Sequence, residues 1–221
     1  MLYIVSTPIG NLSDISARAI ETLKTVDLIL AEDTRNTKKL LDRYKITTRI
    51  ESLHEHSSDE KIAHYIEELK SDLKIAYVSD AGTPNISDPG GKLVARSLEG
   101  GVKVVPIPGP SSLTTLISVA PFSCSEFIFR GFFPKKKGRE TMIKYIEGQK
   151  MPVFFFESPM RIKKTLLLLK QKLPTHSILI GRELTKIFEE ILVIDLGSDE
   201  AEAKLGALTE KGELVFAVFK K

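Results

Sequence analysis

Short apolar runs alternate with amphipathic stretches along the first half of the chain. Four runs of mostly apolar residues have the length of buried strands, at positions 2–5, 28–31, 75–78 and 102–105. The spacing of apolar residues between these runs predicts amphipathic helices, at 16–24, 37–44, 58–69 and 92–98. Strands that alternate with helices are typical of an α/β domain with a parallel sheet. We expect a small sheet of five strands, of which these runs mark four, and residues 102–105 form the last strand, which ends at Pro106.

The second half of the chain, after about Pro121, is richer in aromatic residues. Its strand-like segments lie at positions 127–133, 151–156, 177–180, 190–196 and 214–219. Helical patterns occur at 139–145 and 161–173, and the polar stretch 199–212 predicts a short surface helix and loop. A second, mixed sheet is expected. The sequence thus predicts an α/β fold of two domains, residues 1–113 and 114–221, with the junction near 113–121.

The composition is that of an ordinary globular protein. Apolar residues make up 42% of the 221 residues and charged residues 28%, and 11 Phe residues supply core material without any Trp. The net charge of +3 is too small to indicate a nucleic-acid partner, so a polyanion site must come from local clusters. The single cysteine, Cys124, excludes an intramolecular disulfide, and no Cys/His spacing indicates a metal site. No apolar run is long enough to span a membrane, and we expect a cytoplasmic protein.

The segment 79–90 is the strongest candidate for a ligand loop. It reads Ser-Asp-Ala-Gly-Thr-Pro-Asn-Ile-Ser-Asp-Pro-Gly and follows an apolar run, and a helical pattern resumes only at Lys92. Most connections in α/β units are much shorter. In open α/β folds, ligands bind at the carboxyl edge of the sheet, where such loops lie. The alternative is a plain connection in which Asp80 and Asp88 hydrogen-bond their own loop.

Two further loops follow predicted strands and would reach the same edge. Residues 6–12, Ser-Thr-Pro-Ile-Gly-Asn-Leu, follow the first strand, and residues 106–112, Pro-Ile-Pro-Gly-Pro-Ser-Ser, lead into a helix that ends at Val119. Loop 6–12 is neither a Walker motif nor a Gly-x-Gly-x-x-Gly fingerprint, and alone it can be a simple turn. Ser111 or Ser112 is suited to cap the helix. Three loops at the carboxyl ends of strands in one sheet predict a binding cleft.

Eight short motifs occur in an order that identifies a family. They are the loop 6–12, 31–35 Ala-Glu-Asp-Thr-Arg, 52–56 Ser-Leu-His-Glu-His, the loop 79–90, 108–111 Pro-Gly-Pro-Ser, 131–134 Gly-Phe-Phe-Pro, 157–159 Glu-Ser-Pro and 182–186 Arg-Glu-Leu-Thr-Lys. With them, the chain resembles the bacterial ribosomal RNA small subunit methyltransferase I family of the tetrapyrrole (class III) methylases, from residue 2 to about 219. It departs from the family pattern at Met160, where His is usual, and at Asn85, where an apolar residue is usual. Many relatives also carry a further module after the position of Phe219.

The resemblance implies an enzyme that uses S-adenosylmethionine to methylate the ribose 2′-hydroxyl of a cytidine in the decoding region of 16S ribosomal RNA. It also implies two α/β domains of the class III methylase type, with the cofactor in the cleft between them and a homodimeric assembly. By position in the motifs, the cofactor-binding residues would be Pro8, Gly10, Asp80, Gly82, Thr83, Pro84, Ser111, Ser112, Leu113, Phe156, Glu157 and Leu184. Asp80 can accept hydrogen bonds from the amino-acid tail or the ribose of the cofactor, the helix start at Ser111 can donate to its carboxylate, and Phe156 can contact its adenine.

Methyl transfer from a sulfonium requires mainly that the hydroxyl oxygen be held in line with the methyl group. Three carboxylates are candidates for removing the proton of that hydroxyl, namely Glu32, Asp33 and Glu183. An equally good interpretation of Glu32 and Asp33 is that they pair with Arg35 or cap a helix that begins near Thr34. His54 and His56 are better explained as solvated residues at the end of a strand than as part of the cleft.

Three clusters of basic residues are candidate contacts to RNA phosphates. They are Arg35, Lys38 and Lys39; Lys135, Lys136, Lys137 and Arg139; and Arg161 with Lys163 and Lys164. A ribose hydroxyl of folded RNA must be brought to a pocket, and phosphate contacts beside the cleft would hold the flanking nucleotides. Ordinary solvated charge is the alternative for each cluster. The run at Lys135 is the densest of the three.

Two other functions remain open from the sequence. A small-molecule tetrapyrrole methylase would share the cofactor pocket, although the basic clusters favour RNA over a porphyrinoid. A non-catalytic RNA-binding module of the same fold would bind RNA without turning over the cofactor, and the complete set of cleft motifs argues against it. The predicted partner is therefore 16S ribosomal RNA or the small ribosomal subunit, with no membrane and no metal.

Overall fold

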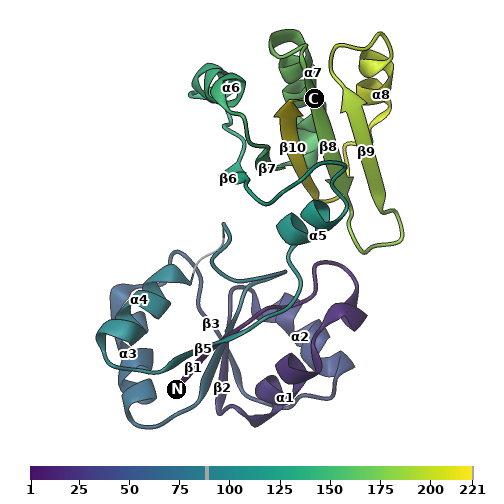
Figure 1. The fold of residues 1–221 in the computed structure, drawn as a ribbon. Helices are drawn as coiled ribbons and strands as arrows, with labels where there is room; N and C mark the ends of the chain where they lie inside the picture. Colours follow the sequence, from purple (N-terminus) through teal and green to yellow (C-terminus); the bar gives the residue numbers. More distant parts are fainter. Residues whose placement is uncertain (88–89, 221) are drawn as a thin grey trace. The chain divides into compact units, whose positions relative to one another are not determined.

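The chain forms two compact units, Met1–Ser111 and Ser112–Lys221, in a computed structural model that describes residues 1–87 and 90–220 (Figure 1). Each unit contains its own five-stranded sheet. Helices cover the sheet in both units, as the alternating pattern predicts. Met1–Ser111 is the first unit and Ser112–Lys221 is the second unit.

The sheet of the first unit is parallel throughout and has the order β3-β2-β4-β1-β5. Its strands are β1 (Leu2–Val5), β2 (Leu28–Ala31), β3 (Ile50–Ser52), β4 (Ile75–Val78) and β5 (Val104–Ile107). The central strands β2 and β4 are buried along their whole length, as expected for strands covered on both faces. All five strands therefore direct their carboxyl ends to the same edge.

Helices cover both faces of this sheet (Figure 1). α1 (Ala17–Thr25) and α2 (Thr34–Arg43) pack on one face through residues such as Leu23 and Leu41, and the 3-10 turn η1 (Leu12–Asp14) precedes α1. α3 (Asp59–Lys70) and α4 (Gly91–Glu99) pack on the other face through residues such as Ile66 and Leu93. The side chains of Ser16, Asp33 and Ser58 accept hydrogen bonds from the first turns of α1, α2 and α3, so each start has its cap.

Two strands of the first unit differ from the apolar pattern. β5 begins and ends two residues later than predicted, and it runs through Pro106 instead of stopping there. A proline is tolerated because β5 lies at the edge of the sheet, where one side of the strand donates no ladder hydrogen bonds. The short strand β3 is half-buried and mixes Ile50 with Glu51 and Ser52, so no apolar run marks its position.

The second unit has the mixed sheet that the sequence predicts, in the order β6-β7-β10-β8-β9. Its strands are β6 (Ile128–Phe132), β7 (Val153–Glu157), β8 (His176–Arg182), β9 (Glu190–Asp195) and β10 (Leu214–Lys220). β6 and β7 are parallel, and the remaining neighbours are antiparallel. β10, the last of these strands in the chain, lies in the centre of the sheet.

The core of the second unit lies between this sheet and the helices α6 (Arg139–Gly148), α7 (Pro159–Lys172) and α8 (Ala201–Ala207). α7 starts two residues before the predicted range because Pro159 occupies its first turn, where a missing N–H costs nothing. α8 falls in the polar stretch 199–212, where the sequence predicts a surface helix. Its Ala201 and Leu205 are nevertheless fully buried, so one face of α8 packs into the core. The short helix α5 (Ser112–Ser118) places Leu116 against Gly181 of β8.

In the part of the chain that the structure describes, every helix is too short or too polar to cross a membrane.

Candidate functional site

The loops that follow β1, β4 and β5 are joined to one another at the carboxyl edge of the first sheet. Thr7 and Gly82 exchange two backbone hydrogen bonds, of 2.9 Å and 3.0 Å. The Ser6 hydroxyl donates to Thr83 Oγ1 at 3.0 Å, and Thr83 Oγ1 donates to the Pro110 carbonyl at 3.0 Å. The three ligand-loop candidates of the first unit therefore form one connected surface.

Two glycines make this close approach possible. Gly82 has a positive φ of 82°, and a Cβ there would lie 3.2 Å from Ile9 Cγ2. A Cβ at Gly109 would lie 3.0 Å from Ser6 Cβ. Larger residues would separate the loops, so Gly82, a predicted cofactor residue, has a structural reason independent of any ligand.

The loop after β4 is also tied to the start of α2 through Asp80. The Asp80 carboxylate accepts hydrogen bonds from the Asp33 backbone nitrogen at 3.0 Å and from Asn36 Nδ2 at 3.4 Å. Its own backbone nitrogen donates to Glu32 Oε2 at 3.5 Å. The alternative from the sequence is a hydrogen bond of Asp80 to its own loop; the observed partners of its carboxylate instead lie at the start of α2. The same alternative for Asp88 lies outside the described residues.

Exposure divides the predicted cofactor residues of the first unit into two groups. Gly10 and Asp80 are exposed and Thr83 is half-buried, so their polar or backbone atoms can reach a ligand. Pro8, Gly82, Pro84 and Ser111 are buried and shape the loops. Asn85 has a positive φ of 73° and is exposed, which explains why a polar residue is compatible with this position.

Asp33 is committed to the start of α2. Its carboxylate accepts from the Arg35 backbone nitrogen at 2.8 Å and forms an ion pair with Arg35 Nη2 at 2.6 Å. The hydrogen bond from the Arg35 side chain, followed by that from the Arg35 backbone, lowers the pKa of Asp33 to about 2. The capping interpretation is confirmed for Asp33, and an acid this strong is a poor proton acceptor.

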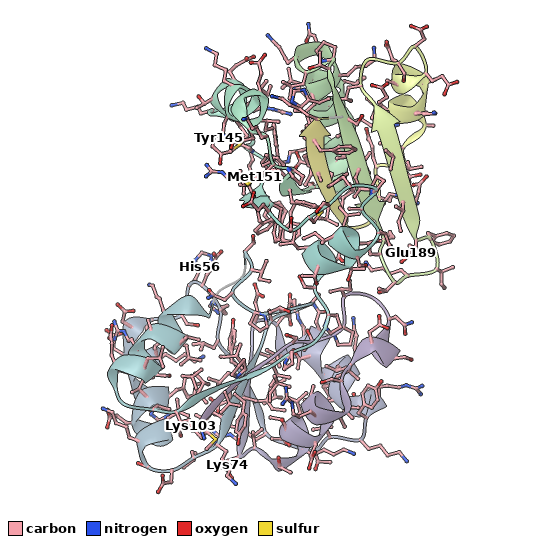
Figure 2. The ribbon with its side chains drawn as sticks, in the orientation of Figure 1. His56, Lys74, Lys103, Tyr145, Met151 and Glu189 are labelled. Carbon is pink, nitrogen blue, oxygen red and sulfur yellow. The ribbon has the colours of Figure 1, made fainter. Side chains whose placement is uncertain are left out.

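His54 and His56, which follow β3, are solvent-exposed, as expected for solvated residues at the end of a strand. Their ring centroids lie 6.2 Å apart, and His56 Nε2 lies 3.3 Å from Glu55 Oε1. In Figure 2, His56 projects from this loop, whereas Lys74 and Lys103 mark the opposite edge of the first unit, before β4 and β5.

A pocket of about 180 Å³ lies beside these histidines and was missed by sequence reasoning. Both apolar and polar residues line it, among them Leu53, His54, Ile62, Tyr77, Gly90 and Lys92. Gly90, with a positive φ of 143°, comes so close to Tyr77 that a Cβ would lie 2.8 Å from the ring. The Gly90-Gly91 pair is the sequence signal that could have indicated a close approach here.

In the second unit, Glu157 occupies a fully buried position at the end of β7. Its Oε1 accepts from the Ser158 backbone nitrogen at 2.7 Å and pairs with Arg161, while its Oε2 accepts from the Thr165 hydroxyl at 2.7 Å. Burial of a carboxylate is tolerated when charge and hydrogen bonds compensate it in this way. The predicted contact of Glu157 with a cofactor stays a prediction, and both carboxylate oxygens already have protein partners.

Two of the predicted RNA contacts belong to the same network. Arg139 Nη2 donates to Thr165 Oγ1 at 2.7 Å, and its guanidinium lies 5.4 Å from the centre of the Phe133 ring. Arg161 Nη1 donates to the Phe133 carbonyl at 3.4 Å. The side chains of Arg139 and Arg161 therefore each have hydrogen-bond partners within the second unit. Sequence reasoning missed Thr165, which is buried in α7 and carries no motif signal.

The three lysines at 135–137 are all exposed and form no ion pair within residues 1–87 and 90–220. Lys39 and Lys164 are likewise exposed, Lys163 is half-buried, and Lys38 lies 3.9 Å from Asp42. The Lys135 run thus remains the densest cluster of available positive charge among the predicted RNA contacts.

Glu183 is held by its own loop and by the turn before β10. Its Oε1 accepts from Lys186 Nζ and from the Glu213 backbone nitrogen, both at 2.8 Å. Burial is the largest single influence and raises the pKa of Glu183, but the hydrogen bonds and charge of Lys186, Glu213 and Arg182 together lower it. Glu183 is therefore better suited to fix this turn than to accept a proton.

The remaining predicted cofactor residues lie in the second unit. Leu113 and Leu184 are buried, and a Cβ at Gly181 would touch the Leu184 side chain at 3.1 Å. Ser112 and Phe156 are half-buried, and the Phe156 ring meets Phe129 and Phe132 at their edges. Met160, at the family's usual His position, is 82% exposed.

Comparison with known proteins places the chain in a family. A model of the tetrapyrrole (corrin/porphyrin) methylases matches residues 1–198. A Thermotoga maritima protein named ribosomal RNA small subunit methyltransferase I is 45% identical over 189 residues, 86% of this chain and 85% of that protein. A protein of the same name from Escherichia coli O157:H7 is 42% identical over 219 residues, 98% of this chain and 77% of that protein.

Solved structures agree on the fold. Diphthine synthase matches with a TM-score of 0.75 at 15% identity and covers 100% of this chain and 90% of that chain. Uroporphyrin-III-C-methyltransferase from Thermus thermophilus matches with a TM-score of 0.65 at 13% identity and covers 99% of this chain and 94% of that chain. Identity this low supports the architecture alone. The family model and the relatives at 42–45% identity establish that the chain belongs to the ribosomal RNA small subunit methyltransferase I family of tetrapyrrole methylases.

Proposed function

We propose that this protein transfers the methyl group of S-adenosylmethionine to the ribose 2′-hydroxyl of a cytidine in the decoding region of 16S ribosomal RNA. The observation that carries the substrate class is the 39–47% identity to relatives named ribosomal RNA small subunit methyltransferase I. Those relatives match 86–99% of this chain, so the proposal covers both units.

The loop surface of the first unit supports S-adenosylmethionine as the donor. The ligand offers an ammonium, a carboxylate and a ribose diol, and it supplies an already activated methyl group. Asp80 is exposed and its carboxylate can accept from the ammonium or the diol, while the exposed Gly10 leaves its backbone accessible. In the second unit, considered by itself, Phe156 is half-buried and its ring is suited to contact an adenine, whereas Leu184 is buried. These residues fit the donor.

Glu32 is the best of the three candidate bases. Asp33 has a pKa of about 2 and is paired with Arg35, and the pKa of Glu183 is lowered within its own turn. Glu32 is half-buried at the end of β2, next to Asp80, and one of its oxygens receives the Asp80 backbone hydrogen bond. A carboxylate at the same edge as the donor loops is placed to take a proton from a bound hydroxyl.

The Lys135–Lys137 run serves as the phosphate contact for RNA. Three exposed ammonium groups within three residues attract a polyanion and release counterions when it binds. Lys39 and Lys164 add exposed charge at the other two clusters. The reaction takes place in the cytoplasm, where RNA of the small subunit is available as substrate.

A second copy of the chain is the proposed partner in a homodimer. β9 lies at the end of its sheet, so one edge of the strand has no neighbour among the described residues. Ile187 and Phe188 before it are 94% and 72% exposed, and Val193 within it is 50% exposed. Two such edges can pair about a two-fold axis and bury these side chains. Light scattering should give a dimer for the unaltered chain and a monomer for Phe188→Ser.

Labelled cofactor tests the proposed reaction. The protein is incubated with radiolabelled S-adenosylmethionine and small-subunit RNA or particles, and the RNA is digested to nucleosides. The label should appear on a ribose oxygen of cytidine. Label on a base would overturn the 2′-O assignment, and label on an added porphyrinoid but not on RNA would favour a small-molecule methylase. RNA binding without any transfer would favour a non-catalytic module.

A further inference from the structure

The loop that carries Lys135–Lys137 is fastened at both ends to one buried carboxylate. At its beginning, the Phe133 carbonyl accepts a hydrogen bond from Arg161, which pairs with Glu157. At its end, Arg139 donates to the hydroxyl of Thr165, which donates to Glu157 at 2.7 Å. Both anchors of the lysine loop thus converge on Glu157.

Thr165 connects Arg139 to Glu157, and its hydroxyl sets which group donates and which accepts in this network. Its hydroxyl proton is committed to Glu157, so its lone pairs are directed at Arg139. Both neighbours are charged, which makes these two hydrogen bonds stronger than bonds between neutral groups. Thr165 and the Glu157 side chain are fully buried, so water is a poor substitute for either partner.

The lysine loop needs an external anchor because it cannot stabilise itself. Three neighbouring ammonium groups repel one another, and none has an ion-pair partner within the described residues. Gly138, which follows them with φ at 89°, adds conformational freedom. A loop that is ordered before it binds loses less conformational entropy on contact with RNA.

We propose that Thr165 is a positioning residue that presets the Lys135–Lys137 loop for RNA by coupling Arg139 to the buried Glu157. This inference rests on the proposed role of the lysine loop in RNA binding. Thr165 acts on RNA affinity through the loop, and the methyl-transfer step at saturating RNA does not depend on it.

The test compares Thr165→Val, which keeps the volume and removes the hydroxyl, with Thr165→Ser, which keeps the hydroxyl. Thr22→Val is the matched control, because Thr22 is a buried helix residue whose hydroxyl donates to the backbone carbonyl of Arg18 in its own helix at 2.8 Å. Thr165→Val removes both charge-assisted hydrogen bonds of this hydroxyl and should raise the Kd and KM for small-subunit RNA about tenfold or more. Its kcat at saturating RNA and its affinity for S-adenosylmethionine should stay unchanged, and Thr165→Ser should restore RNA affinity.

A second background separates positioning from a general structural effect. When Lys135, Lys136 and Lys137 are all replaced by Gln, adding Thr165→Val should cause no further loss of RNA affinity. Trypsin should also cleave after these lysines faster in Thr165→Val than in the unaltered protein or in Thr22→Val. If Thr165→Val does not fold, Arg139→Lys keeps the positive charge, removes the guanidinium contact to Thr165 and should give the same loss.

Three results would count against the proposal. Unchanged RNA affinity in Thr165→Val would show that Thr165 has no role in RNA binding. A parallel loss of RNA affinity, cofactor affinity and kcat would make it a structural residue only. An equal further loss in the lysine-free background would show that Thr165 acts elsewhere. Absence of RNA binding by the unaltered protein would instead contradict the proposed function itself.

Discussion

The Asp80 carboxylate accepts a hydrogen bond from the backbone nitrogen of Asp33 at 3.0 Å, which joins the loop after β4 to the first turn of α2. This bond places a negative charge beside a helix N-terminus, where the helix dipole favours it. It also joins the two acidic loops of the first unit to each other. A cofactor that binds Asp80 would therefore meet a carboxylate that is already oriented.

Replacing Asp80 should weaken S-adenosylmethionine binding. Asp80→Ala removes an oriented acceptor and should cost about 1–3 kcal/mol of binding free energy by calorimetry. Ser112→Ala, at the start of α5, should have a smaller effect. If Asp80→Ala binds the cofactor normally while Ser112→Ala does not, the polar groups of the cofactor lie elsewhere.

Neutralising the lysine loop should change the salt dependence of RNA binding. Gln at positions 135, 136 and 137 should lower affinity for small-subunit RNA and flatten the plot of log Kd against log salt by about one for each lost phosphate contact. Affinity for S-adenosylmethionine should not change. Gln at Lys74 and Lys103, at the opposite edge of the first unit, is the control. A slope equal to that of the unaltered protein would identify the run as ordinary surface charge.

The Asp33–Arg35 pair predicts a specific acid-sensitive contribution to stability. The pKa of Asp33 is about 2 against an ordinary value of 3.8, because Arg35 favours the charged form. A lowered folded-state pKa means that the contribution is complete above about pH 4 and is lost as the pH falls through 2. Asp33→Asn keeps a capping side chain and should lose less stability between pH 4 and pH 2 than the unaltered protein. An NMR titration of the Asp33 carboxyl with a midpoint near 4 would contradict this.

Replacing Gly212 and Gly206 by alanine, one at a time, should change the free energy of unfolding in opposite directions. Gly212 has φ at 89°, and a Cβ there would overlap Glu183 Cγ, so Gly212→Ala should lower the free energy of unfolding by about 1–3 kcal/mol. Gly206 lies in α8 with open space around a Cβ, so Gly206→Ala should raise it by about 0.5–1 kcal/mol. Urea unfolding of both variants measures the difference. Equal effects would mean that the Gly212 turn is not strained by a side chain.

The fold was predictable where apolar patterning is strong. β2 and β4 match their predicted ranges because every residue in them is buried. β3 was not located because it is short and half-buried, and the end of β5 was misjudged because an edge strand accepts Pro106. The order of the strands in either sheet could not be derived from periodicity, since it depends on contacts between residues far apart in the chain.

The loops of the candidate site were predictable from Gly and Pro, but the partners of its charged residues were not. The sequence places Asp33 near Arg35, so their pair was foreseen as an alternative. Arg139 and Thr165 are 26 residues apart, and their contact exists only because α6 and α7 pack in the same core. Of the arginines predicted to contact RNA, Arg161 thus pairs with Glu157 directly and Arg139 reaches it through Thr165, while their contact with RNA stays a prediction.

The central position of β10 has a consequence for how the second unit folds. β7 and β8 are each complete before β10 is made, yet they pair with β10 and not with each other. Until residues 214–220 arrive, two largely apolar strands present unpaired edges, which are open to association with other chains. A chain shortened before Leu214 should therefore aggregate as it is synthesised, whereas the first unit, whose strands all precede residue 108, can close its sheet independently.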